Sequence, residues 1–265
     1  TLGATGLIYC SGETARTSLT TTYSWTIIGD SQCSNNALDF DGVNDFVDAG
    51  GDASLYGHSN LTIEAWVKPD FSVVNDQYVI AATIGSVGAS GGYEMLINSS
   101  KQPFLMYRDD TYTDQVLIGN TVLADDTWYH FAGVIENAGA STNLYIYING
   151  VLDASTTFAN VPNYDAVSNL FIGSNYDGEP VLNTNTREFS GEIDELRIWD
   201  DVRTQAEIQN NISNSLVGNE VNLVAYYSFN EGIPNGDNTT PSVDNLPDLT
   251  LSGNNGTLNN FSLNG

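Results

Sequence analysis

An all-β sandwich is the fold class that the sequence predicts, and three observations favour it. Short runs rich in Val, Ile, Tyr and Phe recur along the chain from residue 36 onward. Gly, Asn and Asp separate these runs at intervals of about eight to fifteen residues, a spacing typical of sandwiches and barrels. The chain has 265 residues, of which 41% are hydrophobic, so it can bury a substantial core.

The strands are expected in sequence order. Their ranges are 37–47 (a strand and its turn), 61–69, 78–84, 93–98, 103–108, 116–118, 128–134, 144–148, 151–154, 170–173, 191–199 and 223–232. The Asn149-Gly150 pair predicts a tight hairpin turn. The Gly-rich segment 85–92 and the polar segments 109–115 and 174–188 are expected to be loops. Residues 249–251 and 256–263 are predicted to close a sheet edge.

One short helix is predicted near 204–213. Thr204 and Glu207 have the spacing of a capping box, in which each side chain accepts a hydrogen bond at the helix start. Ala206, Ile208 and Ile212 follow at helical spacing and would form the apolar face.

The first 35 residues do not match the pattern of the rest, and they are predicted to form an extension packed on the sandwich; the alternative is the remnant of a preceding domain. Thr/Ser-rich sequence and the strand-like Ser24–Ile28 predict a β-extension over 1–35, before a main domain over 36–265. Cys10 and Cys33 are the two cysteines of the chain. In an extracellular protein they would form a disulfide, and in a reducing compartment they would be free thiols. We expect the disulfide.

The charge of the chain excludes several classes of partner. Its 33 acidic and 7 basic residues give a formal net charge of −26. Such a surface repels nucleic acid and anionic membranes.

The chain has no run of about 18 apolar residues that predicts a membrane-spanning helix. It begins at Thr1, and we expect a piece of a larger secreted or cell-surface protein, of bacterial origin and with other domains.

The most informative segment is Phe189–Asp200. Period-two alternation predicts Glu192, Asp194 and Leu196 on one strand face, and Ile193, Glu195 and Arg197 on the other. The segment is similar to the catalytic strand of the family-16 glucanases, whose second Glu follows four or five residues after the first. Leu196 and Arg197 stand there, and retaining chemistry needs two carboxyl groups about 5 Å apart. The segment therefore argues against glycosidase activity.

A different family fits the whole chain better. The segments Ala37–Val47, Leu61–Pro69, Trp128–Val134, Leu144–Val151, Ser190–Trp199 and Leu223–Gly232 resemble, in order, strands of laminin G-like domains. These are non-catalytic relatives of the family-16 glucanases and pentraxins. The resemblance implies a concanavalin A/laminin G-like jelly-roll sandwich of two antiparallel sheets. It also implies that Trp66, Trp128 and Trp199 belong to the core.

A structural calcium ion is the expected cofactor. Calcium prefers six to eight oxygen ligands, and the opening turn supplies several carboxylates and amides. In the relatives, such an ion ties the opening turn to the late Asp-containing strand. The resemblance therefore points to Asp41, Asn44 and Asp194 as ligands. The alternative is that Asp41-Gly42 is only a turn and Asp194 only a hydrogen-bonded carboxylate.

The expected ligand is a polysaccharide, bound through loop residues. Tyrosine rings stack on sugar rings, and neighbouring polar groups bond the hydroxyls. These candidates are Tyr107, Arg108, Asp109 and Tyr112 in one loop region, and Tyr176 and Asp177 in another. Because cations are scarce in the chain, Arg108 suggests an anionic, uronic or sulfated polymer. The alternative is a surface ion pair between Arg108 and an Asp.

The function expected from the sequence is non-catalytic carbohydrate binding. Histidines are limited to His58 and His130, and no His-Glu-x-x-His helix is present, so the sequence assigns no catalytic residues. An adhesion or protein-interaction module is the alternative. A divergent glycoside hydrolase or polysaccharide lyase is the second alternative, and it would require a partner group within reach of Glu192.

Overall fold

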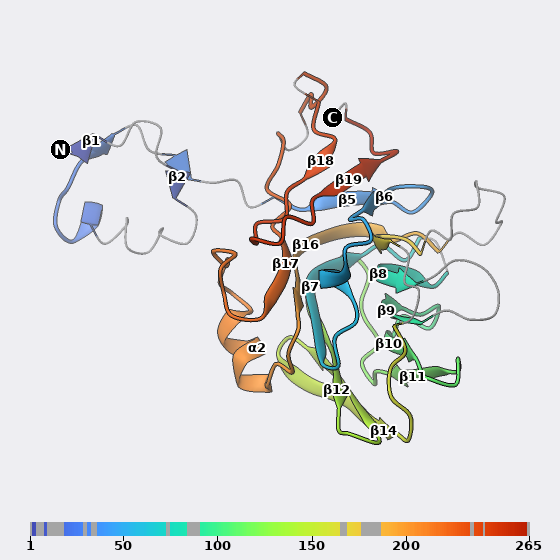
Figure 1. Cartoon of the computed structure of the whole chain (residues 1–265). Coiled ribbons are helices and arrows are strands. Elements are labelled where there is room, and N and C mark those ends of the chain that lie inside the picture. Colours follow the sequence, from blue (N-terminus) through green and yellow to red (C-terminus); the bar gives the residue numbers. More distant parts are fainter. Residues whose placement is uncertain are drawn as a thin grey trace.

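Two antiparallel sheets packed face to face make up the body of the computed structural model (Figure 1). The structure describes residues 2–3, 8–9, 19–28, 31–32, 36–72, 75–83, 91–164, 169–175, 187–233, 236–240 and 242–263. The first sheet has the order β14-β13-β12-β7-β16-β17, and β5 also pairs with β16. The second has the order β11-β10-β9-β8-β15-β6-β19-β18. We call them the β7 sheet and the β8 sheet, and they confirm the predicted jelly-roll sandwich.

Most strands lie where the sequence predicts them, but β11 begins two residues earlier than predicted, β14 ends four residues later and β17 ends five residues earlier. The β7 sheet contains β5 (Leu38–Asp41), β7 (Leu61–Pro69), β12 (Tyr129–Asn137), β13 (Thr142–Ile148), β14 (Val151–Phe158), β16 (Ser190–Trp199) and β17 (Leu223–Tyr227). The β8 sheet contains β6 (Phe46–Asp48), β8 (Gln77–Thr83), β9 (Gly92–Ile97), β10 (Pro103–Arg108), β11 (Asp114–Ile118), β15 (Leu170–Ile172), β18 (Asn245–Leu246) and β19 (Gly256–Asn259). The short 3₁₀ helix η1 spans Ala53–Leu55.

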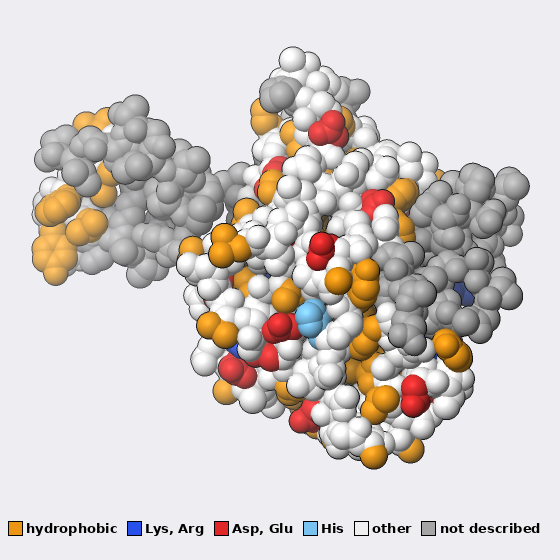
Figure 2. Space-filling model, viewed as in Figure 1, with side chains coloured by type: hydrophobic (Ala, Val, Ile, Leu, Met, Phe, Trp, Pro, Cys, Tyr) orange, Lys and Arg blue, Asp and Glu red, His pale blue; other side chains and the backbone are white. Residues whose placement is uncertain are grey.

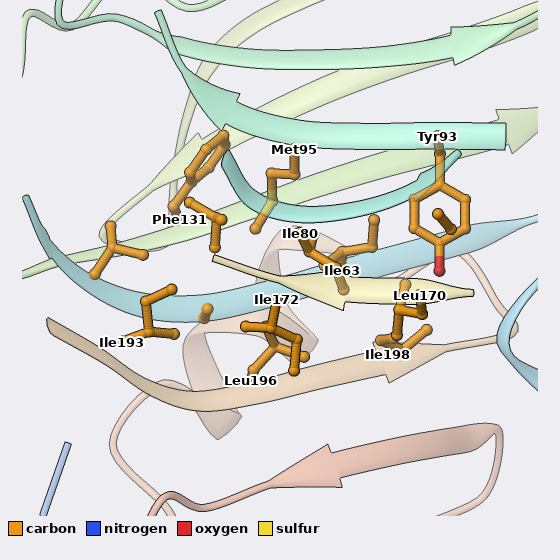
Figure 3. Packing of buried hydrophobic residues seen from close by; sticks show 14 of the residues in the cluster. Ile63, Ile80, Tyr93, Met95, Phe131, Leu170, Ile172, Ile193, Leu196 and Ile198 are labelled. Carbon is orange, nitrogen blue, oxygen red and sulfur yellow. The ribbon is translucent and has the colours of Figure 1, made fainter. Parts of the chain in front are cut away.

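The core lies between the two sheets and is built from alternate residues of their strands. Ile63, Ile193 and Ile198 of the β7 sheet are fully buried, and so are Ile80 and Met95 of the β8 sheet. Figure 3 shows these side chains pointing toward one another between the layers. Successive side chains of a strand point to opposite faces. The residues that alternate with these core residues along each strand therefore face outward.

The sheet edge at the C-terminal end differs from the prediction. Residues 256–259 do form β19, which pairs with β6 and β18. Residues 249–251 were expected to pair with it, but the strand there is β18, at Asn245–Leu246. Asp248 explains the difference, because its carboxylate accepts N–H bonds from Thr250 and Asn254 and so bends the following segment into a turn.

The helix α2 (Gln205–Asn211) covers part of the outer face of the β7 sheet. Its buried residue Ile208 packs against Ala132, Val134 and Tyr147. The capping box is present in full, since Thr204 Oγ1 accepts from the Glu207 N–H and Glu207 Oε2 accepts from the Thr204 N–H. The predicted helix near 204–213 is confirmed.

Removal of the helix cap tests how much the capping box stabilises the protein. Thr204→Ala is expected to lower the free energy of unfolding by about 1 kcal/mol, because one N–H at the helix start loses its acceptor. Thermal and urea unfolding would measure the change. Thr257→Ala is the matched control at an exposed strand position, and an equal loss there would contradict the role of the cap.

The described part of the N-terminal segment forms two pairs of very short parallel strands. β1 (Leu2–Gly3) pairs with β3 (Ile27–Ile28), and β2 (Ile8–Tyr9) pairs with β4 (Ser31–Gln32). Figure 1 shows β1 and β2 to one side of the sandwich. Cys10 and Cys33 lie outside the described residues, so their pairing stays a prediction, as does the division at residue 36. Within the described residues, no helix has the length and apolar character needed to cross a membrane.

Candidate functional site

A β-bulge in β16 places two consecutive acidic residues on the outer face of the β7 sheet. The register with β7 shifts between Asp194 and Arg197, and Glu195 has a left-handed φ of 52°. Leu196 therefore turns into the core, whereas Glu195 and Arg197 join Asp194 on the outside. The predicted alternation is correct up to Asp194 and wrong beyond it, because a bulged residue resets the period of two.

Strand pairing arranges the outward residues in two rows. In the first row, Glu192 lies opposite Asp39 of β5 on one side and opposite Lys68 of β7 on the other. In the second row, Asp194 lies opposite Trp66, and Trp66 lies opposite His130 of β12. The rows are two residues apart, or about 7 Å along the strands.

A hollow of about 530 Å³ opens over the second row. Its lining residues are Asn36, Ala37, Trp66, Trp128, Glu192, Asp194, Glu195, Arg197, Ile212, Ser213, Asn214 and Ser215. They come from β7 and β16, from the segment after α2 and from the segments before β5 and β12. We call this hollow the tryptophan pocket.

Two tryptophans that the sequence assigned to the core belong to this pocket instead. Trp66 is half-buried on the outer face, and its indole N–H donates to the Ile212 carbonyl at 3.0 Å. Trp128 is 37% exposed, because it precedes β12 and lies beyond the last paired residue. Trp199 is buried as predicted, but in a cluster with Leu223 and Tyr226 apart from the main core.

The floor of the pocket is a buried ionic network around Arg197. Its Nη2 donates to Glu195 Oε2 at 2.7 Å and to the Asn214 carbonyl at 2.6 Å. Its Nη1 donates to the Asn211 carbonyl at 3.0 Å, at the end of α2, and lies 3.5 Å from Glu64 Oε1. Glu195 also accepts from the Tyr226 hydroxyl. The guanidinium thus fixes the segment after α2 against the sheet and neutralises buried carboxylates.

The histidine beside this network is unsuited to proton transfer at neutral pH. His130 is 1% exposed, and its Nε2 lies 3.5 Å from Glu64 Oε2. Burial, with the charge of Arg197, lowers the pKa of His130 to about 3. The imidazole is therefore neutral, and it packs edge-on against Trp66 with ring centroids 5.5 Å apart.

The loop region predicted to bind sugar is largely structural. Tyr107 is fully buried in the core, and its hydroxyl donates to the Asn160 carbonyl. Asp109 is also buried. Although desolvation opposes ionisation, hydrogen bonds from Thr111, Asn160 and other neighbours lower the pKa of its carboxyl. Arg108 Nε lies 2.7 Å from Asp114 Oδ1, which is the surface ion pair that the sequence left as the alternative.

Tyr112 is the member of that set with an exposed ring. It is 46% exposed and lines a second, more polar hollow of about 520 Å³ with Asp110, Asn163 and Tyr164. Tyr176 and Asp177 lie outside the described residues, so their predicted role stays a prediction. The backbone N–H of Tyr112 donates to the Asp109 carbonyl at 2.9 Å, but the Tyr107 and Asp109 side chains are buried away from the exposed Tyr112 ring.

Two of the three predicted calcium ligands, Asp41 and Asn44, meet in the opening turn, but Asp194 lies apart from them. Asp41 lies opposite Ser190 in the register between β5 and β16, four residues, or about 13 Å, from Asp194. Asp41 Oδ1 accepts the N–H groups of Val43 and Asn44 and so closes the opening turn, whereas Asp194 faces the tryptophan pocket. Among the described residues, no group of three or more His, Cys, Asp or Glu is placed to hold a metal ion.

Comparison with known proteins agrees with this architecture. The family model of the concanavalin A-like lectin/glucanases superfamily, in its laminin G-like form, matches residues 40–209, well over half of the chain. The fold and the matched motifs define a concanavalin A-like jelly-roll domain. The chain belongs to this laminin G-like family. Among curated proteins, no relative matches the sequence.

Solved structures share the fold at low sequence identity. A candidate carbohydrate-binding protein from Bacteroides ovatus matches with a TM-score of 0.59 and 19% identity, over 88% of this chain and 61% of that protein. The present chain thus spans about 61% of that protein's length. The CBM40 domain of the Ruminococcus gnavus IT-sialidase, bound to α2,3-sialyllactose, matches with a TM-score of 0.50 and 16% identity. That match covers 66% of this chain and 95% of the domain.

Proposed function

We propose that this protein is a non-catalytic carbohydrate-binding module of a secreted or cell-surface protein, and that the tryptophan pocket is its binding site. The observation that carries the proposal is the meeting of two indole rings with carboxylates and amides in one hollow. Trp66 and Trp128 supply the rings, and Glu192, Asp194 and Asn36 supply polar groups. Sugar sites need such a combination, because pyranose rings have apolar faces and polar edges.

The roles of these residues follow from their exposure. The partly exposed Trp128 ring is the stacking platform, and Trp66 is held rigid by its bond to the Ile212 carbonyl. Asn36 Nδ2 and Arg197 Nε line the same pocket and are buried, without a hydrogen-bond acceptor among the described residues. Buried polar groups normally have partners, so these donors suit the hydroxyl oxygens of a sugar.

A polysaccharide screen tests the proposal. Neutral, amine-bearing, uronic and sulfated polymers are compared in affinity gels and by calorimetry, and polymer length is followed in parallel. Binding without loss of length supports the module. Loss of length that Glu192→Gln abolishes would instead favour a divergent glycosidase or lyase, since Glu192 and Asp194 face one pocket. Binding to no polymer would favour the adhesion module.

Calcium is a separate proposal, and it concerns the opening turn alone. Asp45 in this turn is 4% exposed, and its Oδ1 has no hydrogen-bond partner among the described residues, while Oδ2 accepts from the Asp41 N–H. A hard cation bound by oxygen ligands would compensate such a carboxylate. Asp194 is not part of this proposal, because the strand register separates it from the turn.

The titration of Asp45 gives a test of the calcium proposal. Desolvation raises the pKa of its carboxyl to about 6. The folded protein then binds a proton that the unfolded chain has lost, so stability falls as the pH rises from about 4 to about 6. In EDTA at pH 7, Asp45→Asn is expected to raise the unfolding free energy by about 1 kcal/mol. Added calcium should stabilise the wild type and not the variant, and equal stabilisation of both would refute the proposal.

A further inference from the structure

The tryptophan pocket continues along β16 into an acidic hollow of about 430 Å³. Glu192 lines both hollows, so they adjoin at its side chain. The second hollow is lined by six carboxylates and one cation: Asp39, Asp41, Asp70, Asp125, Asp126, Glu192 and Lys68. We call the two together the acidic groove.

The groove already holds one ammonium group, that of Lys68. Its Nζ lies 2.7 Å from Asp126 Oδ1 and 2.8 Å from Glu192 Oε1. These carboxylates raise the pKa of Lys68, so the group is charged at all physiological pH values. Carboxylates of the acidic groove thus bind an amine at hydrogen-bonding distance. One lysine cannot neutralise the charge of all six carboxylates.

One of the other carboxylates, that of Asp39, lies beside Glu192. Asp39 lies directly opposite it on β5, and like charges at opposed positions are unfavourable. Partial desolvation and the charge of Glu192 raise the pKa of Asp39, although Lys68 opposes the shift. A cation held between Asp39 and Glu192 would relieve this repulsion.

Arg197 does not offset this negative potential. The guanidinium is 1% exposed and is shared between Glu195 and Glu64 beneath the pocket. The wider surface has the same sign, and Figure 2 shows acidic side chains scattered over the visible face with hardly any Lys or Arg. A uronic or sulfated polymer would therefore meet repulsion at the groove and on the approach to it.

We propose that the acidic groove recognises a glycan that carries free amines, such as an oligomer of D-glucosamine. The inference rests on the proposed carbohydrate function and names its ligand class. A sugar ring stacks on Trp128, and the amine of the same or the next residue lies between Asp39 and Glu192. In this arrangement the sugar ring contacts an indole ring, and the ammonium group contacts two carboxylates. It contradicts the anionic ligand expected from Arg108, whose guanidinium is paired with Asp114.

Calorimetry with three matched hexamers tests the ligand class. The probes are a D-glucosamine hexamer, an N-acetylglucosamine hexamer and a galacturonate hexamer, titrated into the full chain at mildly acidic pH. The amine-bearing hexamer is expected to bind at least about tenfold more tightly than the acetylated one at low salt. The difference should shrink in about 0.5 M salt, because the groove is open to solvent.

A variant locates the effect. Asp39→Asn is expected to reduce the preference for the amine about three- to tenfold and to leave binding of the acetylated hexamer unchanged. Asp244→Asn makes the same change of charge at an exposed position of the β8 sheet edge, and it should leave the preference intact. Equal losses in the two variants would overturn the assignment to the groove.

The other outcomes separate this inference from the proposed function. Equal binding of the amine-bearing and acetylated hexamers, or tightest binding of galacturonate, would overturn the inference and leave carbohydrate binding standing. If no saccharide binds in this assay or in the wider screen, both fail. Binding of a lysine hexamer alone would also overturn both, and it would favour an adhesion module that takes basic peptides.

Discussion

Arg197→Met is expected to lower the free energy of unfolding by about 3–5 kcal/mol, several times the loss expected from removal of the helix cap at Thr204. The guanidinium is 1% exposed and lies 2.7 Å from Glu195 and 3.5 Å from Glu64, both of which are also buried. Removing one partner of a buried ion pair leaves the other charge without compensation, and this costs far more than the pair itself contributes. Methionine is chosen because it preserves most of the buried volume.

The same substitution also frees the segment after α2. The guanidinium donates to the carbonyls of Asn211 and Asn214, and the segment around them lines the tryptophan pocket. We therefore expect weaker ligand binding together with the loss of stability. A variant that lost stability and kept full affinity would show that the pocket does not depend on this segment.

Chemical unfolding with two further variants distinguishes lost charge compensation from lost volume. Adding Glu195→Gln to Arg197→Met should recover part of the stability, because the uncompensated carboxylate is then removed. Arg108→Met is the matched control, since the Arg108–Asp114 pair is partly exposed and such pairs contribute less than about 1 kcal/mol. If Arg197→Met costs no more than Arg108→Met, the buried network stabilises the fold no more than a surface ion pair does, and the prediction is wrong.

The fold could be predicted because its determinants are local. The strand β7 has the predicted bounds, and the Asn149-Gly150 turn and the capping box at Thr204 also occur where the sequence predicts them. Each of these signals lies within a few residues and agrees with the period of its element. When local preference and global packing agree, a sequence folds to one structure, and that fold can be predicted from the sequence.

The site could be predicted only in part, because it depends on register and on a bulge. Glu192 and Asp194 were correctly placed on one face, since two residues suffice to define alternation. The bulge at Glu195 has no sequence signal comparable to a glycine, so the positions of Leu196 and Arg197 were predicted on the wrong faces. Trp128 was misassigned because its strand begins one residue later, at Tyr129.

The misplaced sugar site has a related cause. Alternation along β10 turns Tyr107 inward, so its ring packs in the core. The turn that follows contains Asp109, whose carboxylate is consumed by hydrogen bonds within the loop. Composition alone groups aromatic, basic and acidic residues there, but burial removes most of them from the surface. The face of a strand, more than its composition, decides which residues can reach a ligand.

Trp128→Ala is expected to weaken binding of the bound saccharide about 10- to 100-fold, or about 1.4–2.8 kcal/mol. The ring is 37% exposed at the rim of the pocket, where it can cover the apolar face of a sugar. The ring lies outside the buried core, so its loss removes contact area for a ligand but little core packing, and the melting temperature should change little. Trp25→Ala is the matched control, because Trp25 is 50% exposed in the N-terminal segment. Calorimetry on both variants decides the matter: unchanged affinity in Trp128→Ala would place the sugar elsewhere, with the hollow beside Tyr112 as the next site to test.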